Sequence, residues 1–284
     1  MDTLRWQNGQ LVLLDQTKLP LEESYITCTK WQDVYDAISI LAVRGAPAIG
    51  VAAAYGSVLA ARMLADTRDY ESTSEFLADF SECCRCLDEA RPTAVNLHWA
   101  LETMKAAAYG AEEQPVSSIL QLLEDKAKSM QAEDVAINTA MSEYGAEELA
   151  AAGKPLTILT HCNAGALATA GVGTALGVIR SLHKRGLIRM VYADETRPLL
   201  QGARLTVSEL MADDIPDLEC MRAVGIPVAP ADAASEILEA ARYVSEYPGG
   251  RGCVRDIVEQ VLRARGQWAL HGKGVNCSKE AKSE

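Results

Sequence analysis

The order of apolar and polar positions predicts a small hairpin followed by a helical region. Near the N-terminus, apolar residues lie on both sides of Asn8-Gly9, a dipeptide typical of the tight turn between two antiparallel strands. From about Trp31 to Arg91 the pattern is helical, with an interruption at the segment "RGAPAIG". We therefore expect several helices after a short N-terminal hairpin.

Two further helices are expected over residues 115–130 and 132–152. The second of them carries apolar residues at spacings of i, i+4 and i+7, which fall on one face of a helix. These residues are Ile137, Met141 and Tyr144. Gly153 follows this segment and is expected to end the helix.

After Gly153 the pattern changes to alternating strands and helices. The segment "LTILTHC" predicts a strand, residues 163–184 a helix, and "IRMVYAD" a second strand. Thr206 and Glu209 have the spacing of a capping box that opens another helix. Strands that alternate with helices in this way favour a parallel sheet with crossover helices, and hence an α/β fold class.

Composition and net charge limit the kinds of molecule that the protein is expected to bind. The chain has 284 residues, of which 49% are hydrophobic, and a formal net charge of −12. An acidic protein lacks the basic surface that broad binding of nucleic acid or anionic membranes requires, although a local pocket can still hold a small anion. The charged N-terminal segment does not resemble a signal peptide, and we identify no membrane-spanning segment, so a cytoplasmic protein is expected.

Eight cysteines are spread irregularly along the chain, and in a cytoplasmic protein we expect them to be reduced. The cluster "CCRC" at residues 83–86 has no second CxxC pair or histidine pair near it. We therefore expect cysteines buried in a helix there, and not a zinc site.

Cys162 is the cysteine with the strongest case for a chemical role. It stands at the carboxyl end of a predicted strand, where ligands of open α/β sheets gather, and Asn163 is placed to cap the helix expected after it. A helix N-terminus favours anions and reactive thiols. The alternative is a buried structural cysteine. The glycines that follow do not form GxGxxG, so we exclude a dinucleotide site.

Three other stretches offer groups that suit an anionic ligand. Arg44 and Gly45 precede Pro47, a residue typical of a first helical turn, and backbone N–H groups there would suit a phosphate. Arg91 precedes a proline and is either an anion contact or a charge at a helix start. Each of these is also compatible with an ordinary capped helix.

The third stretch is "VYADETRPLLQGARLT", residues 191–206. It ends a strand in two acids and continues with three polar side chains in a loop: Arg197, Gln201 and Arg204. Polar loops at the carboxyl ends of strands are frequent ligand sites. The alternative is a turn held by salt bridges.

Five segments together resemble the methylthioribose-1-phosphate isomerases of methionine salvage. They are "RGAPAIG", "RPTAVNL", "EDVAINTAMSEYGAE", "LTHCNAGALATAGVGTALGVIR" and "DETRPLLQGARLT", in the family's order over about residues 1–212. Related members include ribose-1,5-bisphosphate isomerases and regulatory subunits of an initiation-factor exchange complex.

The resemblance implies a helical N-terminal domain, a Rossmann-like second domain, and conversion of a phosphorylated aldose to its ketose. It implies that Arg44, Gly45 and Ala46 hold the substrate phosphate, with further contacts from Arg91 and Gln201. Cys162 is implied as a catalytic residue. Family members are typically homodimers and need no metal or organic cofactor.

The family pattern stops after about residue 212. A segment similar to "GADRIAANGDVANKIGT", which brings the family's catalytic aspartate, does not occur in this sequence. Residues 212–268 instead resemble the C-terminal end of haloacid-dehalogenase-type phosphatases of 3-deoxy-octulosonate 8-phosphate. In the motif "ADDIPD", Asp213 and Asp214 match the usual Mg²⁺-holding acids, but no DxD motif that would supply the nucleophile occurs in the chain.

We therefore expect a fusion of an isomerase front with a phosphatase-like tail. The predicted domains are a helical region over 1–130, the first part of a Rossmann-like domain over 131–212, a tail over 213–270 and a flexible end over 271–284. In the tail, Ile237, Leu238, Ala241 and Val244 fit one apolar helix face.

Three functions remain open at this point: an aldose–ketose isomerase, a binding or regulatory relative without catalysis, and a Mg²⁺-dependent phosphatase. The absent catalytic aspartate favours the second, and the absent nucleophile makes the third the weakest.

Overall fold

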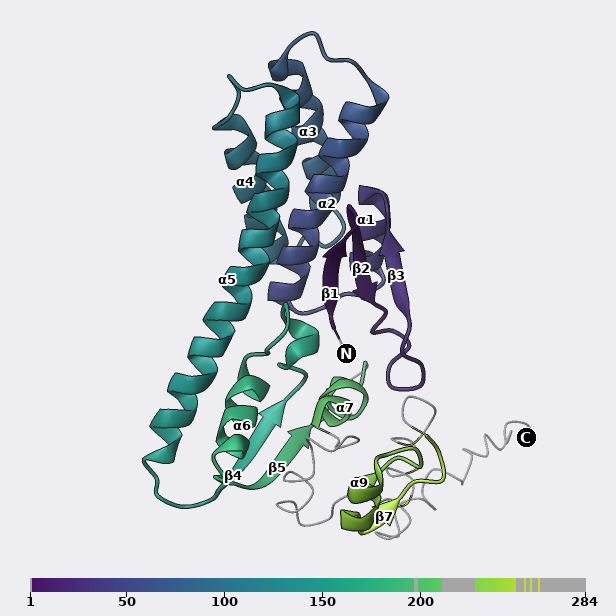
Figure 1. Ribbon diagram of the computed structural model, residues 1–284, viewed down its shortest axis with the longest axis vertical. Helices are drawn as coiled ribbons and strands as arrows, with labels where there is room; N and C mark the ends of the chain where they lie inside the picture. The colour runs from purple at the N-terminus through teal and green to yellow at the C-terminus, as the bar shows by residue number, and fades with distance from the viewer. Residues whose placement is uncertain are drawn as a thin grey trace, which may run out of the picture. The chain divides into compact units, whose positions relative to one another are not determined.

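The computed structural model describes residues 2–196, 199–210 and 228–248, together with Cys253, Asp256 and Gln260. The chain divides into two compact units, Met1–Leu210 and Met211–Glu284, which we treat separately. The described elements form a mixed α/β structure with a helical N-terminal region and small sheets, as expected (Figure 1).

The first unit opens with a three-stranded antiparallel sheet of β1 (Leu4–Gln7), β2 (Gln10–Leu14) and β3 (Tyr25–Cys28). Asn8 and Gly9 join the first two strands with φ angles of 51° and 76°. Two consecutive left-handed residues are what a two-residue hairpin turn requires, so the predicted hairpin is confirmed.

Five helices follow: α1 (Trp31–Ser39), α2 (Ala46–Thr67), α3 (Thr73–Asp88), α4 (Val95–Tyr109) and α5 (Val116–Ala150). Every residue of α2 from Ala48 to Ala61 is buried, because α1, α3, α4 and α5 all pack against it (Figure 1). By length and composition α2 is the one helix in the described part of the chain that could cross a membrane, but 78% of its apolar window is buried inside the unit. It is a core helix.

Two expectations about α5 are wrong. The two helices expected over 115–130 and 132–152 are one continuous helix. Its apolar face also lies in solvent, since Ile137 is 65% and Tyr144 is 73% exposed. In the C-terminal half of α5, the buried face carries small and polar residues. The reason is close packing against α6 (Ala175–Lys184), which leaves little room: a Cβ on Gly145 would stand 2.9 Å from Val178.

The second part of this unit contains a parallel pair of strands, β4 (Leu156–His161) and β5 (Ile188–Asp194), connected through α6. This arrangement confirms the predicted strand–helix–strand order. In the register, Leu159 pairs with Tyr192 and His161 with Asp194, and all four side chains are exposed. The Rossmann-like character of this part stays a prediction.

The helix expected over residues 163–184 is wrong in its first half. Residues 166–168 form one turn of 3-10 helix, η1 (Ala166–Ala168), and α6 begins only at Ala175. Gly173 adopts a φ of 90°, and a Cβ there would stand 2.5 Å from Gly165. The glycines therefore let the chain fold back on itself where their spacing suggested a helix of small residues.

The segment after β5 also differs from the expectation. Gln201 leads into a π-helical turn, η2 (Gly202–Thr206), and then α7 (Val207–Leu210), so Thr206 lies inside the helical segment and does not open it. The predicted capping box is wrong, since Thr206 and Glu209 bond to other parts of the unit. The N-cap residue of the π-helical turn is Gln201, and the carboxylate of Glu195 accepts from the N–H groups of Gly202 (2.9 Å) and Ala203 (3.0 Å).

In the second unit, β6 (Val228–Ala229) pairs in parallel with β7 (Tyr243–Val244), with α9 (Ser235–Ala240) between them in sequence. Ile237 is buried with Ala229 and Ala233, as expected for the apolar face of this helix. The proposed face is too long, because the helix ends at Ala240 and Val244 lies in a strand. Asp213 and Asp214 lie outside the described residues.

Candidate functional site

Cys162 directly follows β4 and adopts a φ of 59°. A left-handed conformation is unfavourable for a residue with a side chain, by about 1–2 kcal/mol. The carbonyl oxygen of Cys162 accepts a 2.6 Å hydrogen bond from the hydroxyl of Thr206, which is fully buried. This contact holds the residue in its unusual conformation. The expected basis for thiol reactivity is wrong, since no α-helix begins after Cys162 until Ala175.

Arg44 lies beside the thiol instead. Its Nη2 stands 3.9 Å from the sulfur of Cys162, and its Nη1 donates to the side-chain oxygen of Asn163 at 3.0 Å. Its Nη2 also donates to the backbone oxygen of Asn163 at 3.3 Å. Two residues predicted for the site from segments 118 positions apart are therefore in contact.

The charge on Arg44 is held in a partly desolvated place. Burial lowers the pKa of its guanidinium, the neighbouring Cys162 and Glu209 raise it, and the nearby charge of Arg91 lowers it. Arg91 is thus close enough to act on Arg44. Two cations in one region favour a ligand with more than one negative charge.

Gly45 and Ala46 begin α2 next to this pair. Gly45 has a φ of 89°, and a Cβ there would collide with the backbone of Ala168. The first turn of α2 carries no acidic residue. A helix start without carboxylates and beside an arginine suits a phosphate, and phosphate binding by these residues stays a prediction.

The contacts of Gln201 lie within its own loop. Its side-chain oxygen accepts from the hydroxyl of Thr196, and its backbone N–H donates to the hydroxyl oxygen of Thr196 at 3.3 Å. A substrate role for Gln201 therefore stays a prediction. Arg197, which the sequence grouped with it, lies outside the described residues.

Arg204 serves the fold. Its guanidinium donates to the carbonyl oxygens of Gln16 (2.9 Å), Thr17 (3.1 Å), Leu19 (3.0 Å) and Leu199 (3.0 Å). It therefore ties the turn after β2 to the loop after β5.

The two acids at the end of β5 differ in their surroundings. Asp194 accepts from His161 at 3.0 Å, and this hydrogen bond holds the pKa of its carboxyl below the usual range. Both side chains are more than half exposed. The carboxylate of Glu195 is occupied by the N–H groups of Gly202 and Ala203. Neither contact brings an acid to Cys162.

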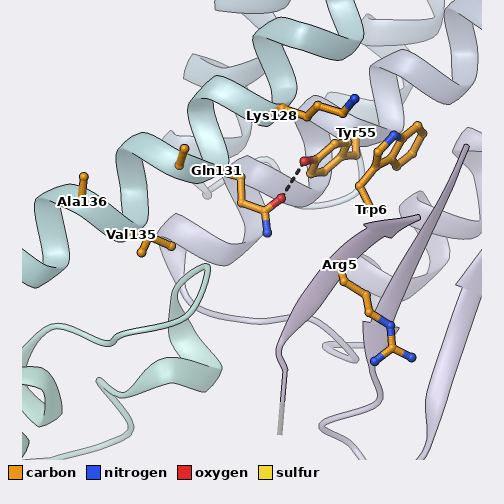
Figure 2. A pocket seen from close by; sticks show the side chains of 8 residues that line it. Arg5, Trp6, Tyr55, Lys128, Gln131, Val135 and Ala136 are labelled. Atoms are coloured by element: carbon orange, nitrogen blue, oxygen red, sulfur yellow. Dashed lines mark hydrogen bonds between the residues drawn. The ribbon is translucent and has the colours of Figure 1, made fainter. Parts of the chain in front are cut away.

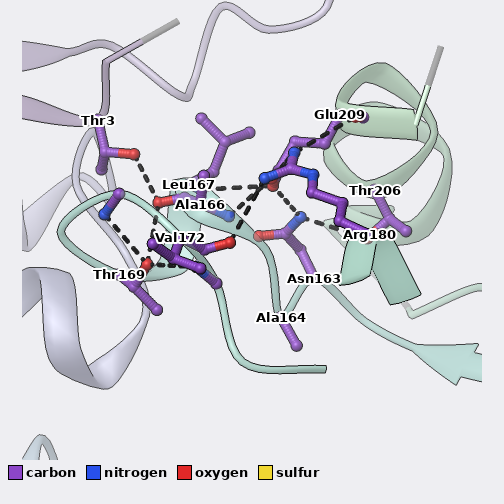
Figure 3. Close-up of polar contacts among 12 residues, drawn as sticks. Thr3, Asn163, Ala164, Ala166, Leu167, Thr169, Val172, Arg180, Thr206 and Glu209 are labelled. Carbon is purple, nitrogen blue, oxygen red and sulfur yellow. Dashed lines mark hydrogen bonds and ion pairs between the residues drawn. The ribbon is translucent and has the colours of Figure 1, made fainter. Parts of the chain in front are cut away.

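Three residues of the network around the site were not identified for this role from the sequence: Asn163, Arg180 and Glu209 (Figure 3). The Glu209 side chain is only 4% exposed and pairs with Arg180 at 3.1 Å. It also accepts from the side chain of Asn163 and the backbone N–H of Ala166, both at 2.7 Å. The signal that could have found it is an acid inside the apolar segment "LTVSEL", where an unpaired carboxylate is unfavourable.

A pocket of about 560 Å³ lies elsewhere in this unit, between β1, α2 and α5 (Figure 2). Its wall includes Trp6, which stacks on Tyr55, and Gln131, which accepts from the Tyr55 hydroxyl at 2.6 Å. None of the predicted site residues lines it.

The cysteine cluster on α3 has the environment of structural thiols. Burial raises the pKa of Cys84 to about 12 and that of Cys83 to about 11. Over the part of the chain that the structure describes, no three His, Cys, Asp or Glu side chains form a group that could hold a metal ion.

Comparison with known proteins gives consistent matches over this part of the chain. The model of the initiation factor 2 subunit family matches residues 42–221. A methylthioribose-1-phosphate isomerase of Pelotomaculum thermopropionicum is 52% identical over 218 residues, which are 76% of this chain and 58% of that protein. One of Heliobacterium modesticaldum is 53% identical over 76% of this chain and 61% of its own length. The chain thus spans about three fifths of these relatives.

Two solved structures share this fold. The 5-methylthioribose 1-phosphate isomerase of Pyrococcus horikoshii superposes with a TM-score of 0.66 at 37% identity, over 81% of this chain and 65% of that one. The translation initiation factor eIF-2B subunit delta of A. fulgidus gives 0.64 at 39% identity, over 82% and 68%.

A further solved structure matches at much lower similarity, and the resemblance of the tail to phosphatases stays a prediction. The 3-deoxy-D-manno-octulosonate 8-phosphate phosphatase of Moraxella catarrhalis matches 46% of this chain and 74% of its own at 18% identity, with a TM-score of 0.22. At that TM-score the match does not establish a shared fold.

Proposed function

Because the chain belongs to the initiation factor 2 subunit family, we propose that it acts on a sugar phosphate as an aldose–ketose isomerase. The proposed reaction converts 5-methylthioribose 1-phosphate to 5-methylthioribulose 1-phosphate, as the names of its relatives suggest. The observation that carries the proposal is the contact of Arg44, at the start of α2, with Cys162. It brings a cation that could hold a phosphate next to a thiol.

In this reaction the phosphate on C1 prevents the sugar from opening as a free aldose does. The ring C1–O bond breaks, the hydrogen on C2 moves to C1, and the C2 hydroxyl becomes the carbonyl as its proton passes to the former ring oxygen. The phosphate would bind at the start of α2 with Arg44 and Arg91. Cys162 would lie next to the reacting carbons, where a group that exchanges protons is needed.

A second candidate function is binding without turnover. The family's catalytic aspartate segment does not occur in this sequence, and the similarity to the eIF-2B subunit delta of A. fulgidus extends over as much of the chain as that to the isomerase of P. horikoshii. A regulatory relative would keep the phosphate site and lack the chemistry.

One experiment separates these candidates. The purified protein is incubated with 5-methylthioribose 1-phosphate, ketose formation is followed, and binding is measured by calorimetry, with Cys162→Ser as the control. Ketose formation that is lost in the control supports the isomerase. Binding without product supports the regulatory relative, and a protein that neither binds nor converts the sugar phosphate contradicts both.

We also propose a homodimer in the cytoplasm that works without metal or organic cofactor. Light scattering of the purified chain tests the dimer. Activity that survives exhaustive chelation and dialysis tests the independence from cofactors.

A further inference from the structure

Glu209 is a buried carboxylate with unusually many donors. Besides Arg180, Asn163 and the N–H of Ala166, it accepts a longer contact of 3.4 Å from the N–H of Leu167. A buried carboxylate in the absence of such partners would be strongly unfavourable. The donors come from α6, from the residue after Cys162 and from η1, so one side chain connects three segments (Figure 3).

The network continues from Glu209 to the thiol. Asn163 donates its Nδ2 to Glu209 and accepts with its Oδ1 from Arg44 at 3.0 Å. An amide that donates on one side and accepts on the other has a fixed orientation. Glu209 therefore fixes the orientation of the Asn163 amide, so that its oxygen is turned toward Arg44. Arg44 in turn contacts Cys162.

Glu209 also acts on Arg44 through charge. Arg44 is partly desolvated, and the charge of Glu209 counteracts the effect of burial on its pKa. Glu209 thus supports both the position of the guanidinium and its positive charge.

We propose that Glu209 is a positioning residue that acts through Asn163 to hold Arg44 against Cys162 and so prepares the phosphate site. This inference rests on the proposed function, because it takes Arg44 and Cys162 to be substrate-site residues. Glu209 itself touches no substrate; its effect on binding passes through Arg44.

The test compares Glu209→Gln, Arg44→Ala and the double variant in the full chain, with 5-methylthioribose 1-phosphate as the probe. We expect Glu209→Gln to weaken binding about tenfold, since a charge-assisted hydrogen bond is disturbed. The double variant is expected to bind no more weakly than Arg44→Ala alone, because residues in one network are not additive. Glu143→Gln is the matched control, since Glu143 pairs with Arg185 on the surface at 2.7 Å.

The outcomes separate the two proposals. An Arg44→Ala variant that binds like the wild type contradicts the proposed site. The inference is wrong if Arg44→Ala weakens binding and folded Glu209→Gln does not. It is also wrong if the affinity loss of the double variant equals the sum of the losses of the two single variants. In either case Glu209 stabilises the fold without acting through Arg44. Should Glu209→Gln not fold, Asn163→Ala breaks the same connection and leaves the Arg180 pair intact. Wild-type binding by Asn163→Ala overturns the inference as well.

Discussion

At the scale of single residues, Arg44 is the side chain with the clearest expected effect. Replacing it with alanine removes a cation from a partly buried site, and we expect binding of a sugar phosphate to weaken by about 1.5–3 kcal/mol. Calorimetry measures this change. The control is Arg68→Ala, which removes an exposed partner of Asp79 and leaves binding unchanged. An unchanged dissociation constant for Arg44→Ala excludes Arg44 from the site.

The cysteines are expected to differ in their rates of alkylation. Burial raises the pKa of Cys28 and Cys84 to about 12 and that of Cys83 to about 11, so their thiolate fractions are very small at pH 8. Cys162 is half-buried and stands beside a guanidinium. Iodoacetamide labelling at pH 8 followed by peptide mapping is expected to show Cys162 modified well before these three. If Cys28 or Cys84 is labelled before Cys162, the result contradicts the burial that is expected to slow their alkylation.

His98 gives a pH-dependent prediction. Its hydrogen bond to Asp88, 2.7 Å long, raises the pKa of the imidazole above 6.5. A raised pKa in the folded state means that the pair stabilises the protein at pH values below 6.5, and that this contribution is lost as the pH rises through the raised pKa. An NMR titration checks the direction. Asp88→Asn is expected to return the pKa toward 6.5, and equal pKa values in both proteins would contradict the pairing.

Some residues of the candidate site could be identified from the sequence and others could not, for a physical reason. Arg44, Gly45 and Cys162 carry signals that are local in sequence: a proline just inside a helix start and a thiol at the end of a strand. Glu209 and Arg180 depend on which distant segments meet, and sequence spacing does not contain that information. The expected capping role of Glu209 used local spacing, and a contact with Asn163 replaced it.

At the scale of elements, the hairpin and the strands β4 and β5 were predicted correctly because alternation and turn residues act over a few positions. The strand β3 was not predicted, and Val244 of β7 was expected in a helix. The loop between β4 and α6 was not predicted either. Its Ala, Gly and Thr residues are compatible with a helix, but other partners take its N–H groups: Asp134 accepts from Ala170 at 2.7 Å, and Thr169 accepts from Gly173 at 2.9 Å. Tertiary hydrogen bonds thus replace the helical ones.

Thr169 provides a test of this account. Its hydroxyl is buried and accepts from the N–H groups of Gly171 (3.2 Å) and Gly173. In Thr169→Val both donors lose their acceptor while the shape is kept, so we expect a loss of about 1–3 kcal/mol in the free energy of unfolding. Chemical denaturation measures it. Thr139→Val, on the exposed side of α5, is the control and is expected to change stability by less than about 0.5 kcal/mol. Equal effects in the two variants would contradict the account.

At the scale of the whole molecule, the chain keeps the part of the family fold that holds Arg44, Gly45 and Cys162 and spans about three fifths of its relatives' length. The β4–β5 pair in this part carries exposed apolar side chains. Leu159 is 69% and Tyr192 is 56% exposed, side by side in register on one face of the sheet. Apolar pairs on a sheet face are normally covered by another layer, and a sequence pattern does not reveal whether the cover is present.

The last prediction concerns the tail, whose motif resembles that of a phosphatase. Asp213 and Asp214 are two adjacent acids, and Mg²⁺ prefers six oxygen ligands in octahedral geometry and releases water reluctantly, so this pair alone holds the ion weakly. The chain has no DxD motif to supply the nucleophile. We therefore expect no hydrolysis of p-nitrophenyl phosphate or of a sugar-acid phosphate above background in Mg²⁺. Asp213→Asn is the control: hydrolysis by the wild type that this variant abolishes would establish the tail as a phosphatase site.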